Sequence, residues 1–418
     1  MLPSLPILVL LLAAEPAAAP ASRAISFDAA LGLTERTPNV VGATRASREK
    51  ATLDRNISSI PYNPQLSVMP GWRFAPSNAR QPELVVEILQ PWNLSGQSRA
   101  RRRTIALEEG VLQAEARAAA LSSRIAAARA WITVWASEHV LEETRREERI
   151  AAELERLVDR ATTLGAMTRA DLAEARAYHA EARVAVLNAE GELFQSGLTL
   201  GREVGSPQAT PLLAEGALPD APAPAAARSA EYLQQMDLLP SVAMKGFQAR
   251  AAGAREAEEK AIRGTLAQVG AVLQRDAPDG LVISGLARVT FPLFERGERE
   301  RAGMRADELR LEGEREDALL AARFELAASF HEVDHTAELL AVLRDDLAPA
   351  SREAAETRRR IFQNGGATLL EVLQSDRTAV IAASRLWRIQ AEHAWARTKL
   401  WLLATEVALR AAAPEARR

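Results

Sequence analysis

The 418-residue chain contains no cysteine, which excludes a disulfide scaffold, a thiolate zinc site, a cysteine nucleophile and an anchor on a lipid-modified cysteine. A strong charge of either sign is also absent: the formal net charge is −3, whereas a nucleic-acid-binding protein normally has a clear basic excess. After the first residues, no segment approaches the roughly 20 apolar residues that a membrane-spanning helix needs. The chain is nevertheless 48% apolar, which argues against disorder.

The first residues have the pattern of an export signal. An apolar run over Leu5–Ala14 is followed by Ala19-Pro20-Ala21, which fits an A-x-A cleavage site. We therefore predict a signal peptide over residues 1–21, although no lysine or arginine precedes the run. The alternative is an apolar helical start.

Proline is missing from two long stretches, and both are rich in helix-forming residues. None occurs between Pro91 and Pro207, and only Pro349 and Pro414 follow Pro292. Because an interior proline costs a helix about 3 kcal/mol, these stretches permit long helices. Apolar residues spaced alternately four and three apart, as in a left-handed coiled coil, occur at Ile150, Leu154, Leu157, Ala161 and Leu164 and again at Leu326, Phe330, Val333, Ala337 and Leu340. We predict helices over residues 26–60, 97–164, 168–203, 229–262, 298–364 and 367–410, with a kink at Pro349.

Four short segments alternate apolar and polar residues instead, which is typical of strands with one apolar face. They cover residues 65–74, 82–92, 267–274 and 281–291. Polar turns over 75–81 and 275–280 join them in pairs, so we predict two β-hairpins among the long helices.

The chain also reads as an internal repeat. Pro292 and Gly297 lie 201 positions after Pro91 and Gly96, and Gly366-Ala367 lies 201 positions after Gly165-Ala166. We predict a first repeat over residues 22–204, a Pro- and Ala-rich linker over 205–228, a second repeat over 229–410 and a C-terminal tail over 411–418. Four strands cannot close a barrel, but three copies of the chain would supply twelve.

Several motifs resemble the TolC-like outer-membrane efflux protein family, the outer-membrane factors of tripartite efflux systems. They are Ile25-Ser26-Phe27-Asp28, Pro38-Asn39, Asn63-Pro64-Gln65-Leu66, Pro292-Leu293-Phe294 and Phe362-Gln363-Asn364-Gly365. The resemblance implies a mainly α fold with a small β part. It consists of a long α-helical coiled-coil barrel, plus four strands per chain in a 12-stranded trimeric membrane β-barrel.

The same resemblance implies the function. The protein would be a homotrimeric exit duct in the bacterial outer membrane, with a long periplasmic extension. It would passively conduct substrates from a periplasmic adaptor (membrane fusion) protein and an inner-membrane efflux transporter. Neither catalysis, nor a cofactor, nor nucleic acid is implied.

The resemblance also assigns a periplasmic gate. Glu371 falls at one position of an acidic ring, Gln374 replaces the second acid, and Phe362 stands where a gating tyrosine is usual. Asp171 matches an acidic position of the first tip turn. The tip turns, and with them the adaptor contact, would include Gly165, Gly365 and Gly366. Alternatively, both carboxylates simply favour helix starts, where the dipole is positive.

Other features point elsewhere. His331, Glu332 and His335 spell H-E-x-x-H, the pattern of a zinc peptidase, but they flank a heptad stripe and lack an obvious third ligand, so we reject a metal site. A soluble periplasmic coiled-coil scaffold or adaptor-like protein is the main alternative function. Near the predicted strands, interfacial aromatic belts or packing where the barrel meets the helices are the two interpretations of Trp72, Trp92, Phe291 and Phe294. The arginines that follow either meet anionic headgroups or form a solvated helix face; they are Arg99, Arg101, Arg102 and Arg103.

Overall fold

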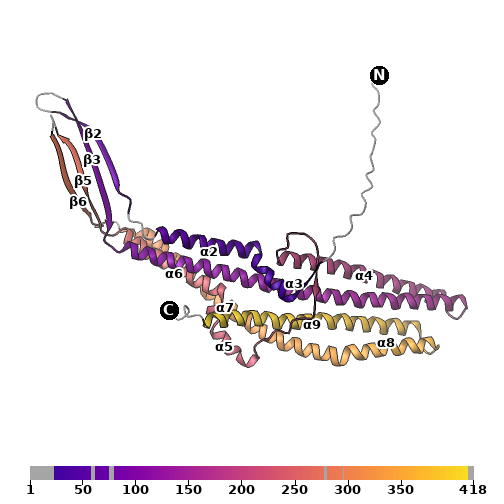
Figure 1. Ribbon diagram of the computed structural model, residues 1–418. Coiled ribbons are helices and arrows are strands. Elements are labelled where there is room, and N and C mark those ends of the chain that lie inside the picture. The colour runs from indigo at the N-terminus through magenta and orange to yellow at the C-terminus, as the bar shows by residue number, and fades with distance from the viewer. Residues whose placement is uncertain (1–22, 58–61, 75–79, 277–279, 295, 413–418) are drawn as a thin grey trace, which may run out of the picture. The chain divides into compact units, whose positions relative to one another are not determined.

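The computed structural model describes residues 23–57, 62–74, 80–276, 280–294 and 296–412 (Figure 1). The predicted signal peptide therefore lies outside the described residues, as does most of the predicted C-terminal tail. The chain forms two compact units. Unit 1 comprises Met1–Leu33, Ala126–Pro219 and Glu338–Trp395, and unit 2 comprises Thr34–Ile125, Asp220–Ala337 and Ala396–Arg418. Each unit draws on both halves of the chain, and the proposed repeat boundaries stay a prediction.

Unit 2 contains one four-stranded antiparallel sheet in the order β2-β3-β5-β6. The strands are β2 (Gln65–Phe74), β3 (Arg80–Asn93), β5 (Leu266–Asp276) and β6 (Gly280–Thr290). All four predicted strands and both hairpins are confirmed, because alternation over about ten residues is a local signal that needs no partner to be read. Gly270 lies where β3 and β5 meet, and a Cβ there would come within 1.8 Å of the carbonyl oxygen of Ile88.

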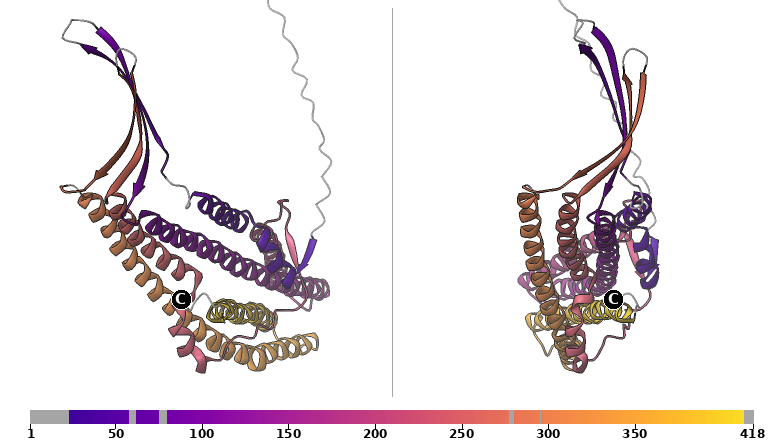
Figure 2. Two further views of the ribbon diagram at one scale, coloured as in Figure 1. Left: turned by 60° about the vertical axis from the view of Figure 1, so that its left-hand side comes forward. Right: turned by 90° about the vertical axis from the view of Figure 1, so that its left-hand side faces the viewer.

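Three helices of unit 2 adjoin this sheet in the chain, because α6 leads into β5 while α3 and α7 follow β3 and β6 (Figure 2). The helices of unit 2 are α2 (Pro38–Ile57), the first part of α3 (Gln97–Thr163), α5 (Ser229–Gln234), α6 (Pro240–Ile262), most of α7 (Glu298–Val342) and the end of α9 (Leu369–Ala412), with 3₁₀ turns at Thr34–Arg36, Ala226–Arg228 and Met236–Leu238. An ion cluster joins three of these helices: the Lys50 ammonium lies 3.1 Å from Glu108, and Arg255 lies 2.6 Å from the same carboxylate.

Unit 1 contains the rest of α3, together with α1 (Phe27–Leu33), α4 (Arg169–Glu203), a π-helical segment over Leu343–Leu347, α8 (Ala348–Gln363) and most of α9. A parallel pair of short strands, β1 (Arg23–Ser26) and β4 (Leu212–Glu215), lies against the helices. The predicted linker is therefore partly a strand. The indole of the fully buried Trp131 donates a hydrogen bond to the Ile25 carbonyl at 2.8 Å, which ties β1 to α3. Gly197 allows β4 to approach α4, because a Cβ there would lie 2.8 Å from the Leu212 carbonyl oxygen.

Three predicted helices are interrupted, in each case near a proline. The helix predicted over 26–60 restarts at Pro38, and the one predicted over 229–262 restarts at Pro240. Proline suits a first helical turn, where its missing amide hydrogen leaves no bond unmade. Pro349 instead follows the π-helical segment, where wider hydrogen bonding accommodates the clash that its ring would make with the carbonyl four residues earlier. Within the described ranges, no helix is long and apolar enough to cross a membrane.

Candidate functional site

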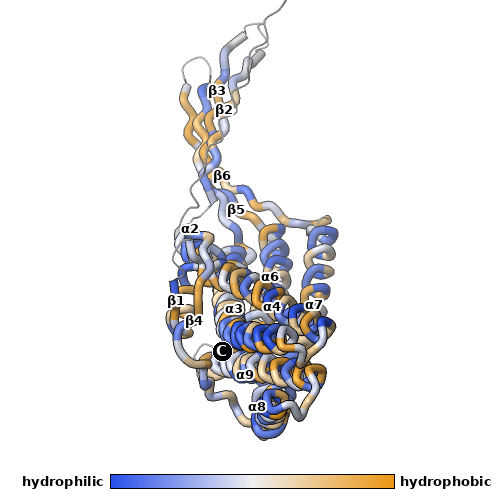
Figure 3. Tube along the Cα trace, turned by 90° about the vertical axis from the view of Figure 1, so that its right-hand side faces the viewer, coloured by the Kyte–Doolittle hydropathy of each residue, from blue (hydrophilic) through white to orange (hydrophobic). Residues whose placement is uncertain are grey.

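The sheet of unit 2 has two chemically different faces. Residues that pair across the strands point to the same side, so Leu66, Ile88 and Ala271 share one face. The apolar members of this face are Leu66, Val68, Trp72, Leu84, Val86, Ile88, Val269, Leu273, Leu281, Ile283 and Val289. Most of them are exposed, and hydropathy alternates along the strands (Figure 3). The face is continuous over all four strands, and within the described residues nothing covers it.

The opposite face carries a ladder of polar contacts. The Gln268 amide donates to the Gln65 side chain at 3.3 Å, and Arg288 lies 3.5 Å from the Glu87 carboxylate. Arg288 also donates to the Gln268 oxygen, so the ladder crosses from strand to strand. A sheet with a bare apolar face, a hydrogen-bonded polar face and two unpaired edge strands is suited to a surface between lipid and water.

The far ends of the long helices in unit 1 form two turns of the same design. Gly165 ends α3 with φ 74° and Gly365 ends α8 with φ 77°, both in the left-handed region. The amide of the next residue reaches back five positions, from Ala166 to the Ala161 carbonyl and from Gly366 to the Ile361 carbonyl, both at 2.9 Å. This is the Schellman helix ending, in which glycine avoids the cost of the left-handed backbone.

The two turns show that equivalent residues of the two repeats are 200 positions apart at this end of the helices, one fewer than the sequence predicted. The two left-handed glycines, Gly165 and Gly365, are 200 positions apart, whereas Gly96 and Gly297, with φ 77° and 69°, are 201 apart. Matching Gly165-Ala166 to Gly366-Ala367 is therefore wrong by one residue. The matching Gly-Ala dipeptides selected Gly366, but the residue with positive φ in the second turn is Gly365. The positive φ, rather than the identity of the next residue, is what requires glycine in these turns.

Each return helix begins with a capping box. The Thr168 hydroxyl accepts from the Asp171 amide at 3.1 Å, and the Asp171 carboxylate accepts from the Thr168 amide at 2.8 Å. Thr368 and Glu371 repeat this arrangement at 3.3 and 2.9 Å. Both carboxylates therefore lie at helix starts and take part in capping, and their role in a gate stays a prediction. The Thr168 side chain holds the pKa of Asp171 below its usual range, and the Thr368 amide does the same for the pKa of Glu371.

The comparisons with known proteins give the fold. No protein-family model and no curated protein matches the chain, but solved structures do. The outer-membrane channel OprN has a TM-score of 0.74 at 16% identity, over 90% of this chain and 89% of its own. The outer membrane protein VceC from Vibrio cholerae has 0.69 at 14%, over 91% and 95%. The open state of the Neisseria gonorrhoeae outer membrane channel MtrE has 0.69 at 15%, over 90% and 88%.

The chain has the fold of the TolC-like outer-membrane channels. In this fold the two turns of unit 1 are the ends of two helical hairpins, α3–α4 and α8–α9. The predicted fold class is confirmed for the single chain: mainly helical, with four strands that form an open sheet.

The two tip carboxylates of this TolC-like fold differ in their second partners. Glu371 uses one oxygen in its capping box, and the other accepts from the Arg358 guanidinium at 3.2 Å. Asp171 uses Oδ2 for both of its Thr168 contacts, and it has no ion pair with any residue that the structure describes. Asp171 is therefore the less neutralised of the two.

The other predicted gate residues occupy different environments. Phe362 is half-buried and packs on a core cluster formed by α3, α4 and α9, with Val158, Tyr178 and Val372 among its members. Gln374 is exposed on α9. Phe362 thus belongs to the packing of the tip in this chain, while Gln374 is free to face solvent or a partner. Their roles in a gate stay predictions.

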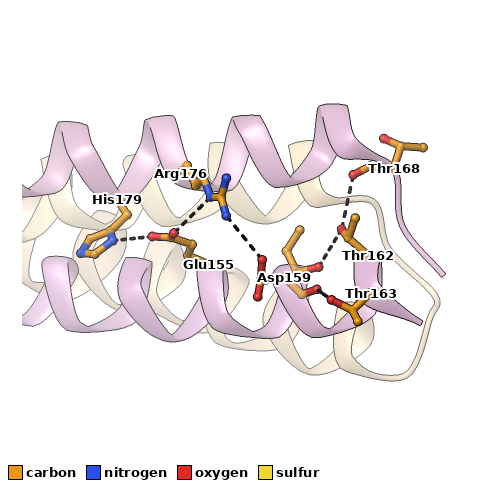
Figure 4. A network of polar contacts seen from close by, with 8 residues as sticks. Glu155, Asp159, Thr162, Thr163, Thr168, Arg176 and His179 are labelled. Atoms are coloured by element: carbon orange, nitrogen blue, oxygen red, sulfur yellow. Dashed lines mark hydrogen bonds and ion pairs between the residues drawn. The ribbon is translucent and has the colours of Figure 1, made fainter. Parts of the chain in front are cut away.

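Polar contacts hold the first hairpin together near its turn (Figure 4). His179 Nδ1 lies 2.6 Å from the Glu155 carboxylate, and Arg176 bridges Glu155 and Asp159 at 3.5 Å each. The Thr162 hydroxyl lies 3.4 Å from the Thr168 carbonyl oxygen across the turn. These contacts fix α4 against α3 and so set the position of the Asp171 capping box.

The sequence analysis missed a buried acid beside the tip. Asp376 on α9 is 3% exposed, and its Oδ1 lies 3.0 Å from Arg359 Nε on α8. Burial raises the pKa of Asp376 to about 6, although Arg359 opposes the shift. Asp376 follows Leu369 and Val372 at the spacing of a core stripe, and an acid at such a position is the signal that could have identified it.

The H-E-x-x-H motif lies on the exposed face of α7. The His331 and His335 rings stack with centroids 5.7 Å apart, and Glu332 lies between them in the sequence. Among the residues that the structure describes, no group of three or more potential ligands is placed to hold a metal ion. The rejection of a zinc peptidase stays a prediction.

Proposed function

We propose that this protein is the outer-membrane channel of a tripartite efflux system, a passive exit duct that works as a homotrimer. The sheet of unit 2 carries the proposal, because among the described residues its apolar face is uncovered and its edge strands β2 and β6 are unpaired. Three copies would supply twelve strands, which is within the range of outer-membrane barrels. The apolar face would then meet lipid, and the ladder around Gln268 and Arg288 would line the water-filled interior.

The long helices would extend the duct into the periplasm. With 67 residues, α3 is about 100 Å long at 1.5 Å per residue. We propose that its tip meets a periplasmic adaptor protein, which links the duct to an inner-membrane transporter, and that the turns at Gly165, Gly365 and Gly366 take part in the contact. The transporter would then select the cargo. The fold shared with channels such as OprN and MtrE supports this assignment.

We propose further that Asp171 and Glu371 make the tip selective for cations. In a homotrimer each carboxylate occurs three times around the axis, and rings of carboxylates favour cations. Since Arg358 offsets part of the charge of Glu371, releasing Glu371 from this partner should strengthen the effect. Phe362 and Gln374 would shape the same constriction.

The test is single-channel recording of the purified protein in planar bilayers, with selectivity measured from reversal potentials in a salt gradient. We expect Glu371→Ala to lower cation selectivity and Arg358→Gln to raise it. Glu353→Ala, which removes an exposed acid from α8, is the matched control and should change neither. Unchanged cation selectivity in Glu371→Ala would refute the proposed gate. The channel proposal would still stand if the variant conducts ions.

The alternative, a soluble periplasmic scaffold, predicts a different fractionation. A monomer that stays in the soluble fraction after cell lysis would overturn the channel proposal. A detergent-extracted trimer from the outer-membrane fraction would support it.

A further inference from the structure

The polar face of the four-stranded sheet carries one cation in its part nearest the helices. Pro91, Gln268 and Arg288 pair across β3, β5 and β6, so they point to the same side of the sheet. Glu87 lies on this side as well, because it is four residues before Pro91 on β3. Between the levels of Asn93 and Glu87, Arg288 and Glu87 are the charged side chains of this face that the structure describes.

Arg288 projects further from the sheet than the acid that it contacts. The side chain of Arg288 is 54% exposed, whereas that of Glu87 is 12% exposed. Arg288 Nη2 donates to the Glu87 carboxylate and Nη1 to the Gln268 side-chain oxygen, both at 3.5 Å, which is long for a hydrogen bond. The other N–H groups of this guanidinium, including Nε–H, form no hydrogen bond with any residue that the structure describes. The outermost charged group of this level is therefore a cation with donors left for a ligand.

We propose that Arg288 forms an anion-binding ring inside the barrel and favours the passage of compounds that carry a carboxylate group. This inference rests on the proposed function and adds to it a chemical class of cargo. In a homotrimer the guanidinium would occur three times around the lumen at one level, and rings of arginine favour anions in pores. The planar fork of a guanidinium matches the two oxygens of a carboxylate.

Glu87 and Gln268 position the ring rather than cancel it. Their contacts with Arg288 hold the guanidinium at one level of the sheet, and the recessed carboxylate offsets only part of its charge. The ring therefore has the opposite sign to the exposed carboxylates Asp171 and Glu371 at the tip. A compound that crosses the whole duct would meet a negative station at the tip and a positive one in the barrel.

The opposite face of the sheet offers a matched control. Arg275 on β5 pairs with Leu84 and Leu281, so it lies on the apolar face, and its side chain is exposed. Arg275→Gln removes the same charge as Arg288→Gln from the other side of the same sheet. In the proposed barrel this side faces lipid, so the control should not change ion passage.

The charge of the ring is tested with reversal potentials of the full-length protein in bilayers of phosphatidylethanolamine, which has no net charge. The Debye length is about 30 Å at 0.01 M salt and about 3 Å at 1 M, so a charge on the wall acts across the lumen only in dilute salt. In dilute salt we expect Arg288→Gln to raise the permeability of cations relative to anions about two- to fivefold. Arg288→Lys should stay close to wild type, and conductance at 1 M should be the same in all variants.

Removing the compensating acid should have the opposite effect. Glu87→Gln leaves the charge of Arg288 unopposed, so the permeability of cations relative to anions should fall in dilute salt. A purely structural Arg288–Glu87 contact predicts equal loss of stability in both variants and no change in selectivity. Opposite shifts in the two variants therefore separate an electrostatic role from a structural one.

The ligand chemistry is tested with citrate, a small molecule with three carboxyl groups. We expect citrate to reduce the conductance of wild type, and Arg288→Gln to raise the concentration needed for half-inhibition at least about fivefold. Arg275→Gln and the tip variant Glu371→Ala should keep the inhibition of wild type. Inhibition that is lost in Glu371→Ala but kept in Arg288→Gln would move the citrate site to the tip and overturn the ring.

Three further outcomes are decisive. If channels form and Arg288→Gln changes neither selectivity nor citrate inhibition, the ring is refuted and the channel proposal stands. If Arg275→Gln changes them instead, the apolar face does not meet lipid, and the ring fails together with the proposed orientation of the sheet. If the protein forms no channels in bilayers, the ring and the channel proposal both fail.

Discussion

Replacing the buried Asp376 by asparagine should change how the stability of the protein depends on pH. Burial dominates the environment of this carboxyl and raises its pKa from 3.8 to about 6, despite Arg359 at 3.0 Å. The surrounding charged groups on the neighbouring helices are Glu147 on α3 and Tyr178 and Glu181 on α4, with Arg377 next to it on α9. Burial also raises the pKa of Glu147, so this environment disfavours negative charge as a whole.

The direction in which the free energy of unfolding changes with pH follows from proton binding. Between about pH 4 and pH 6 the folded chain binds a proton at Asp376 that the unfolded chain has released, so the free energy of unfolding falls as the pH rises through this window. A shift from 3.8 to about 6 corresponds to about 3 kcal/mol per chain. At pH 4 the unfolded Asp376 side chain has already lost part of its proton, so only about 2.4 kcal/mol of this remains to be lost between pH 4 and pH 7. An asparagine side chain cannot titrate. Over that range the unfolding free energy of Asp376→Asn should therefore rise by about 2.4 kcal/mol relative to that of wild type.

The assay is urea unfolding of the detergent-solubilised protein followed by circular dichroism at both pH values. Comparing the two differences cancels any constant effect of the asparagine side chain. Asp159→Asn on α3 is the control for the same chemical change, since that carboxylate is 53% exposed and water screens its interactions. A difference between Asp376→Asn and wild type that does not change with pH, or that changes in the opposite direction, would refute the claim that burial outweighs the Arg359 pair.

Three further predictions concern local structure, and thermal unfolding measures each of them. Gly365→Ala should destabilise the protein by about 1–2 kcal/mol, because φ 77° is unfavourable for a residue with a Cβ, and Gly303→Ala within α7 should not. Thr168→Ala should cost about 1 kcal/mol through the loss of its capping hydrogen bond, and Thr168→Ser should restore most of it. Trp131→Phe should cost about 1–3 kcal/mol, since the Ile25 carbonyl would lose its buried donor at 2.8 Å; no loss would show that β1 is held by other contacts.

Most of the fold could be predicted from local sequence patterns, as the strands and the long helices show. The helix predicted over 97–164 is α3 (Gln97–Thr163), and the strand predicted over 65–74 is β2. Both are long enough for their own periodicity to identify them. The strands β1 and β4 were missed because each has four residues and pairs with a segment about 190 positions away. The helices predicted over 26–60 and 229–262 are interrupted and restart at Pro38 and Pro240. These restarts were missed because the prediction relied on the average composition of each segment rather than on the position of its proline.

The candidate site could be predicted from the sequence less completely than the fold. The glycines and carboxylates of the tip have sequence signals, because Thr-x-x-Asp and Thr-x-x-Glu predict capping boxes. The ion-pair partners of those carboxylates have no such signal in the sequence. Arg358 reaches Glu371 from the preceding helix. Asp171 has no ion pair with any described residue, and the sequence around it does not indicate this difference. The Arg359–Asp376 pair likewise joins two helices.

The opposite pKa directions at the tip separate two possible origins of a pH effect on conductance. Hydrogen bonds lower the pKa of both Asp171 and Glu371, so both carboxylates keep their charge in mildly acidic solution. A cation selectivity that depends on them should therefore be constant between about pH 5 and pH 7. Asp376 is the group whose charge changes near pH 6, and it lies in the packed core beside the turn rather than among the exposed carboxylates. A conductance that changes in this range without a change in selectivity would follow from altered packing of α8 against α9, and Asp376→Asn should abolish it while Glu371→Ala should not.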